Sequence, residues 1–385
     1  MTDGVQPVSR TRSIDLLRGA VMVLMVLDHA RDFFVGLAKS PTNLATTTLP
    51  LFLTRWVTHF CAPVFVLLAG VAAALYAAKR GLPATRTFLL TRGLWLIVLE
   101  LTIVRFAWIP EPFYRFILLQ VIWTLGWALV ALAALSFLPV RAVAAIGLVI
   151  ALGHNLLDPY DRGSFGALEP LWNVLHERGM IRTGGRSIFV SYPVLPWIGV
   201  AAVGFAVGGW FQRPAPERQR LLLRSGLAAL AGFVVLRAIN VYGDPHPWAQ
   251  QARGVAFTVM SFFNCEKYPP SAAFSLMTLG PALVALALLE RVPATKLEPL
   301  SVFGRVPLFF YVAHLYLLRV VAIPLALARW GKTAILPPPG HAGSPEYPLW
   351  VGYLAWLIAL FALYPACRWF ARKKAESKSP WLSYL

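Results

Sequence analysis

Ionisable side chains that could do chemistry lie within the first hydrophobic segment of the chain. Asp15, Arg18, His29 and Asp32 interrupt residues 14–35, which are otherwise apolar enough for lipid. A charge in such a segment is costly to bury and usually marks a functional site. On a helix, Arg18 and His29 are nearly eclipsed and roughly 16 Å apart along the axis. The spacing therefore predicts a polar stripe along one side of a membrane helix.

A second polar cluster lies in the next hydrophobic segment. Arg55 and His59 are four residues apart and share a helix face, and Pro63 is expected to bend the helix just beyond them. If the first loop lies outside the cell, His59 and His29 could meet in one cavity. Two histidines could also bind a metal, but no third carboxylate or thiolate ligand follows at a fixed spacing. We therefore predict no metal site.

A third cluster precedes the eighth hydrophobic segment. Asn264, Glu266, Lys267 and Tyr268 stand before two prolines, and they could form a rim that holds a polar acceptor. An interfacial anchor is the alternative, since Tyr and Lys favour that depth in any membrane protein. His314, in the ninth segment, is a further candidate for a buried functional or structural group.

The composition predicts the elements that must position these side chains. Of 385 residues, 58% are hydrophobic and 14% charged, and repeated apolar runs of about 18 to 25 residues fit bilayer-spanning helices. The predicted fold is all-α, a polytopic integral membrane protein with about ten transmembrane helices. We expect one membrane domain over residues 14–370, between an N-terminal segment (1–13) and a basic tail (371–385). The predicted spans are residues 14–36, 51–78, 88–108, 114–138, 141–157, 190–211, 221–240, 271–290, 302–325 and 348–370.

The positive charge follows the predicted membrane topology. The formal net charge is +18, but the basic residues gather in alternate connections between spans, as membrane insertion dictates. This distribution argues against a nucleic-acid partner. It predicts that both termini are cytoplasmic and that residues 38–50 and 242–270 form external loops of a protein in the bacterial inner membrane. The only long polar stretch, residues 158–187, is expected to be a loop with a short helix.

Four segments of the sequence resemble one family. They are residues 12–19 with the apolar run that leads to His29, residues 55–63, residues 266–281 and residues 303–311. These segments resemble transmembrane acyltransferases related to heparan-α-glucosaminide N-acetyltransferase, including bacterial proteins once grouped as a domain of unknown function. The spacing of Arg18 and His29 is also similar to that of the acyltransferase type 3 membrane proteins.

The resemblance implies a transmembrane acyltransferase-like helical bundle that moves an acyl group, in the first place acetyl. The donor would be cytoplasmic acyl-CoA, and the acceptor a hydroxyl or amine, in the first place of a sugar or glycan, at the outer face. His29 is the expected general base, because an imidazole can take a proton from the acceptor and return it to the thiolate. Asp32 could fix its tautomer, and Asp28 is a further catalytic candidate. The lysosomal enzyme has its catalytic histidine after the first span, where residues 39–50 here contain none, so His59 remains the alternative base.

Acyl-CoA would be a co-substrate rather than a tightly bound cofactor. Its phosphates need cations, which Arg86, Arg92 and Arg305 could provide at the inner side. Arg18 would help to hold the pantetheine or phosphate portion of CoA, or pair with Asp15. On the outer side, Arg55 and His314 join the third cluster as candidate acceptor-binding residues.

Another function fits the same residues. A proton-coupled transporter of a small anionic solute could use the intramembrane His, Arg and Asp side chains, and it would favour helices broken by Gly or Pro. Prolines here cluster mainly at the ends of the predicted spans, with Pro63 and Pro324 as exceptions. Besides membrane lipid, acyl-CoA and the acceptor, a second copy of the chain is an open partner, because the sequence does not determine the oligomeric state.

Overall fold

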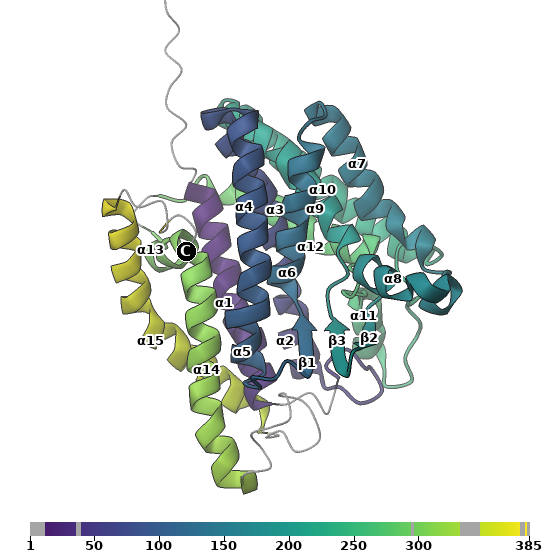
Figure 1. Ribbon diagram of the computed structural model, residues 1–385. Helices are drawn as coiled ribbons and strands as arrows, with labels where there is room; N and C mark the ends of the chain where they lie inside the picture. The colour runs from purple at the N-terminus through teal and green to yellow at the C-terminus, as the bar shows by residue number, and fades with distance from the viewer. Residues whose placement is uncertain (1–11, 36–39, 294–295, 332–346, 378–381, 383–385) are drawn as a thin grey trace, which may run out of the picture.

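A computed structural model describes residues 12–35, 40–293, 296–331, 347–377 and 382 of the chain. Most of them form helices that run side by side along one direction (Figure 1). The expected N-terminal segment and the end of the basic tail fall largely outside these residues. The first half of the chain contains α1 (Arg12–Phe34), α2 (Leu49–Thr58), α3 (Cys61–Arg80), α4 (Leu82–Leu99), a π-helix (Glu100–Val104), α5 (Arg105–Trp108), β1 (Phe116–Leu119), α6 (Val121–Leu135), α7 (Val140–Gly153) and a 3-10 helix (His154–Leu157).

The second half begins with the polar stretch and continues into the remaining long helices. It contains a 3-10 helix (Arg162–Leu168), α8 (Glu169–Leu175), β2 (Gly179–Thr183), β3 (Arg186–Val190), α9 (Leu195–Gly208), a 3-10 helix (Gly209–Gln212), α10 (Ala215–Ile239), α11 (Val255–Phe263), α12 (Ala272–Leu289), α13 (Glu298–Arg305), α14 (Pro307–Trp330) and α15 (Leu349–Glu376).

The helices confirm an all-α polytopic membrane protein. Among the described residues, eight helical segments are long and apolar enough to cross a membrane. Two more helices complete the match to the ten predicted spans: α1, of 23 residues, which carries charges, and α6, of 15 residues. The N-terminal end of α1 and the α3–α4 and α9–α10 connections lie at one end of the bundle, and the small sheet lies at the other (Figure 1).

The predicted boundaries differ from the structure at three places. The span expected at residues 114–138 begins as strand β1, and its helix starts only at Val121. The polar stretch at residues 158–187 contains β2 and the start of β3 as well as the expected short helix. In the three-stranded sheet, β3 pairs parallel to β1 and antiparallel to β2. The span expected at residues 302–325 is divided, because α13 ends at Arg305 and Pro307 begins α14, where a missing N–H costs no helical hydrogen bond.

Helix α1 packs against α2, α3, α12, α13, α14 and α15, so its polar stripe faces protein rather than lipid. The closest approach is to α13. A Cβ on Gly19 would collide with the carbonyl oxygen of Leu300, and one on Gly304 would collide with that of Asp15. Only glycine allows two helix backbones to come this close, a common device in membrane helix pairs. This contact fixes Arg18 beside Gly304, whose carbonyl oxygen it reaches at 3.0 Å.

Candidate functional site

Two buried histidines from opposite ends of the sequence meet at the centre of the candidate site. His29 of α1 and His314 of α14 lie with Nδ1 and Nε2, respectively, 2.7 Å apart, and their rings are nearly parallel. The Nδ1 atom of His314 lies 2.8 Å from the backbone oxygen of Phe310, one helical turn earlier. His314 is 0% exposed. Helix packing thus holds both rings in one orientation.

This chain of hydrogen bonds determines which nitrogen of His29 can act as a base. A carbonyl oxygen only accepts, so His314 Nδ1–H donates to Phe310 and His314 Nε2 carries a lone pair. His29 Nδ1–H must then donate to His314 Nε2, and the lone pair of His29 lies on Nε2. The arrangement matches a general base that is oriented by a second group, as acyl-transfer sites require.

Aromatic side chains enclose the His29 ring. Trp108 packs edge-on against it at 5.1 Å between ring centroids, and Tyr311 lies at 6.1 Å. Trp108 stands at the end of α5, directly after the π-helix Glu100–Val104. A π-helical turn inside a helix often occurs at a functional site. The aromatic walls make the surroundings of His29 largely apolar, which strengthens electrostatic interactions there.

A buried ion-pair cluster lies on the adjoining face of α1. Asp28 accepts from Arg55 Nη1 at 2.8 and 2.7 Å, from Thr58 Oγ1 at 2.8 Å, and lies 3.0 Å from Arg31. Arg31 also pairs with Asp32 at 2.6 Å. Two carboxylates therefore balance two guanidinium groups. Such a network is stable inside a membrane protein only while every member keeps its partner.

The break between α2 and α3 places Arg55 in this cluster. The α2 helix ends at Thr58, and residues 59 and 60 form a turn before α3 begins at Cys61. The regular helix is therefore interrupted three to four residues before Pro63, where the sequence predicts a bend. Arg55 and Thr58 lie in the last turn of α2, and both donate to Asp28 of α1.

Tyr268 and Lys267 extend the cluster towards the end of the bundle that carries the sheet. Arg55 Nη2 donates to the Tyr268 hydroxyl at 2.9 Å, and Lys267 Nζ lies over the rings of Tyr268 and Tyr192. Burial acts to raise the pKa of Tyr268, but Arg55 and Lys267 outweigh it and lower that pKa to about 8. With Lys267 included, the cluster carries a surplus positive charge.

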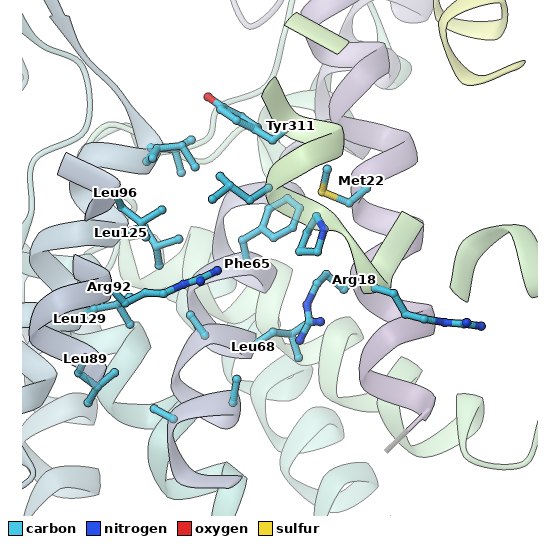
Figure 2. A pocket seen from close by; sticks show the side chains of 18 of the residues that line it. Arg18, Met22, Phe65, Leu68, Leu89, Arg92, Leu96, Leu125, Leu129 and Tyr311 are labelled. Carbon is cyan, nitrogen blue, oxygen red and sulfur yellow. The ribbon is translucent and has the colours of Figure 1, made fainter. Parts of the chain in front are cut away.

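A cavity approaches His29 from the opposite end of the bundle. Its volume is about 310 Å³, and basic residues line it together with an apolar wall: Arg18, Arg92, Arg305 and Lys374 stand among Met22, Phe65, Leu68, Leu96 and Tyr311. In Figure 2, Arg92 and Arg18 lie on two sides of the space, Phe65 lies between them and Tyr311 closes the far end. Tyr311 also packs against His29, so the cavity extends from the basic residues to a direct neighbour of the histidine pair.

Several predicted site residues lie where the sequence analysis placed them. Arg18 pairs with Asp15 at 3.3 Å and, like Arg92 and Arg305, lines the cavity. Arg86 does not: it bonds to Ser136 and stacks on Phe137, so its cofactor-binding assignment is not supported by the geometry.

The predicted partners of His29 are wrong in two respects. Asp32 bonds to Arg31 and does not fix the tautomer of His29; His314 has that position. His59 packs against Phe274, at 5.3 Å between rings, whereas His29 has His314 as its hydrogen-bond partner. The structure places His314 beside the candidate base, His29, rather than with the third cluster.

The third predicted cluster divides into two parts. Tyr268 and Lys267 join the Asp28 network, whereas Glu266 caps its own loop by accepting from the backbone N–H groups of both residues. The hydrogen bond from His246 to Glu266 raises the pKa of that histidine. Asn264 donates to the backbone oxygen of Thr42. Asn264 and Glu266 thus hold loops together.

The sequence analysis missed several side chains of the site. Lys374 lines the cavity although it lies in the expected basic tail, because α15 continues to Glu376 and packs against α1. Trp108 and Thr58 belong to the surroundings of His29 and Asp28. Of these residues, only Thr58 could have been found from the sequence, because it lies three residues after Arg55 on the same helix and so on the same face.

The fold and the site define an integral membrane protein with a buried, oriented imidazole next to Tyr311, which lines a basic and apolar cavity. The family described as heparan-alpha-glucosaminide N-acetyltransferase, catalytic, matches residues 10–238, more than half of the chain. The chain therefore belongs to this family, and its function is of the membrane acetyltransferase type. No match is found among curated proteins.

Proposed function

We propose that the protein transfers an acetyl group from acetyl-CoA to a hydroxyl or amine of a sugar or glycan, with His29 as the general base. The observation that carries the proposal is the hydrogen-bond chain from His29 through His314 to Phe310, because it leaves the lone pair of His29 on Nε2. Family membership supports the acetyl-transfer chemistry.

The cavity suits the donor. Arg18, Arg92, Arg305 and Lys374 offer cations for the phosphates of CoA, and the apolar wall around Phe65 suits the pantetheine arm. An extended pantetheine arm covers about half the thickness of a bilayer core. It can therefore bring the thioester from the basic residues towards Tyr311 and His29, roughly 16 Å along α1 from Arg18.

The acceptor would approach from the end of the bundle that carries the sheet. Arg55, Lys267 and Tyr268 are the candidate contacts there, and Asp28 holds Arg55 in place through two hydrogen bonds. A surplus positive charge at this end favours an oxygen-rich or acidic acceptor. We do not assign this role to Asn264 or Glu266, whose polar atoms serve their own loops.

The proposed reaction conserves atoms and charge. His29 Nε2 takes the proton of the acceptor hydroxyl or amine while that atom forms a bond to the acetyl carbon. The carbon–sulfur bond breaks, and the thiolate of CoA takes the proton back from His29. During the transfer, His314 Nε2 accepts from Nδ1–H of the imidazolium and so stabilises its charge.

The distribution of basic connections supports a cytoplasmic location for the end of the bundle that carries the N-terminus of α1. Arg18 and Lys374, which line the cavity, would then be cytoplasmic-side residues. Donor and acceptor would then arrive from opposite sides of a bacterial inner membrane, with both termini in the cytoplasm.

Proton-coupled transport of a small anionic solute remains a second candidate function, and one observation favours it. Helices α12, α14 and α15 contain Pro281, Pro324 and Pro365 in their interiors, so Pro281 and Pro365 join Pro324, which the sequence analysis had already singled out as an exception. Broken or kinked helices are typical of transporters. Family membership favours the enzyme.

Acetyl-CoA binding and slow hydrolysis by the purified full chain test the proposal, with water as the acceptor. His29→Ala should keep binding and lose hydrolysis. Arg92→Ala should weaken binding, whereas Arg86→Ala, on the same helix but outside the cavity, is the matched control and should not. An absence of acetyl-CoA binding would favour the transporter. If His29→Ala left hydrolysis unaffected, the general base would have to be another residue.

A further inference from the structure

A second group of chemically competent side chains lies away from the acetyl-transfer site. His154 begins the short helix after α7, Asp158 follows it by four residues, and His176 comes directly after α8. Figure 1 labels α7 and α8. One nitrogen of each histidine and one carboxylate oxygen all lie within 4.8 Å of one another. The sequence analysis found no such group, because the third ligand is supplied by a separate helix.

The hydrogen bonds leave ring nitrogens of this group unused. His154 Nε2 lies 2.8 Å from the backbone oxygen of Pro270, which can only accept, so Nε2 carries the proton and Nδ1 the lone pair. The Nδ1 atoms of both histidines are buried and have no hydrogen-bond partner among the described residues. Each histidine is only 3% exposed. A buried lone pair without a partner is unfavourable, and a metal ion bound to His154 Nδ1 would satisfy it.

The geometry and chemistry of the donors fit a particular class of ion. His176 Nε2 lies 3.1 Å from Asp158 Oδ1, close to the separation of about 3.4 Å between neighbouring ligands of a tetrahedral ion with bonds near 2.1 Å. Two imidazoles and one carboxylate suit a divalent transition metal such as zinc, whereas calcium and magnesium prefer oxygen ligands. The carboxylate of Asp158 is partly exposed, which gives an ion a path in.

Surrounding contacts orient the ligands, as outer partners do in metal sites. Pro270 holds the His154 ring, and Asn155 donates to Asp158 Oδ2 at 2.8 Å. Asn155 also accepts from the backbone N–H of Ala272. The cluster thus connects α7 and α8 to residues 270–272, directly after Tyr268.

We propose that His154, Asp158 and His176 bind one divalent transition-metal ion of the zinc class, and that the ion joins α7 and α8 to the segment before α12. The site is independent of the proposed acetyl transfer. Its fourth coordination position is left to water.

Metal analysis of the full-length protein, purified in detergent with a tag that lacks histidine, tests this proposal. After treatment with a chelator, reloading with Zn²⁺ and removal of the excess, we expect about one zinc per chain. His176→Ala and Asp158→Asn should weaken Zn²⁺ binding at least about tenfold. His246→Ala is the matched control, because its side chain is 71% exposed and lies outside the cluster. Zinc well below one equivalent in the wild type, or unchanged binding in both variants, would overturn the proposal.

A second measurement needs no variant. Co²⁺ in the site should give the visible absorption of a four-coordinate ion, which Zn²⁺ displaces. Chelation should lower the melting temperature of the wild type, and Zn²⁺ but not Mg²⁺ should restore it. A melting temperature indifferent to chelator and zinc, with no visible Co²⁺ band, would contradict the proposal even if the variants fail to fold.

Discussion

The hydrogen bond between the two histidines offers the sharpest test of the proposed catalytic arrangement. His314→Leu removes the acceptor of the hydrogen bond from His29 Nδ1–H. It leaves the cavity wall unchanged, because His314 does not line the cavity. When His29 is protonated in the transition state, this bond is made to a charged group and contributes about 1.5–3 kcal/mol. Since 1.36 kcal/mol corresponds to a factor of ten in rate, kcat should fall about 10- to 150-fold.

The assay is acetyl-CoA hydrolysis under single-turnover conditions, with acetyl-CoA binding measured separately by calorimetry. Binding should change little, because His314 does not line the cavity. His314→Gln is the matched variant: its side-chain oxygen can still accept from His29, so it should retain more activity than His314→Leu. A His314→Leu protein with wild-type kcat would refute the assignment of His29 as an oriented base. Equal losses in both variants would show that ring packing matters and that the hydrogen bond does not.

Three other predictions concern the network, its titration and the helix contact. Asp28→Asn should lower the free energy of unfolding by about 3–5 kcal/mol, measured by thermal melting in detergent, because the Arg55 guanidinium loses its buried counter-charge; an unchanged melting temperature would contradict a buried ion pair. The pKa of about 8 predicts that one phenol ionises as the pH rises through 8, seen as tyrosinate absorption near 295 nm that is missing in Tyr268→Phe; identical titrations of the two proteins would disprove it. Gly19→Ala should destabilise the protein by forcing α1 away from α13, whereas Gly153→Ala, at a position with open space, should be tolerated; similar melting of the two variants would count against the close contact.

The candidate site was predicted in part. His29, Arg18 and Arg92 could be selected from the sequence because a charged or titratable group in an apolar segment stands out by itself. The partner of His29, in contrast, could not be predicted from the sequence. Asp32 is the neighbour of His29 by helical spacing, yet it bonds to Arg31, and His314, 285 residues away, occupies the position expected for it.

The same limit applies to Glu266 and Arg86. Each has the right residue type on the right side of the predicted topology, but a local partner uses its polar atoms: backbone N–H groups for Glu266, and Ser136 for Arg86. Residue type and depth in the membrane do not reveal such partners. They depend on how loops and helix ends are packed.

The sequence by itself determined the long apolar helices, eight of which are apolar enough to cross a membrane among the described residues, because hydrophobicity over about 20 residues is a local property that lipid selects directly. It also determined the polar stripe on α1, since helical periodicity alone aligns Arg18 with His29. Tertiary structure decided which residues meet across helices: His29 with His314, Asp28 with Arg55, and His154 with His176. The physical reason is that these contacts depend on close helix packing, such as that at Gly19 and Gly304, and on the turn after α2, neither of which any single segment specifies.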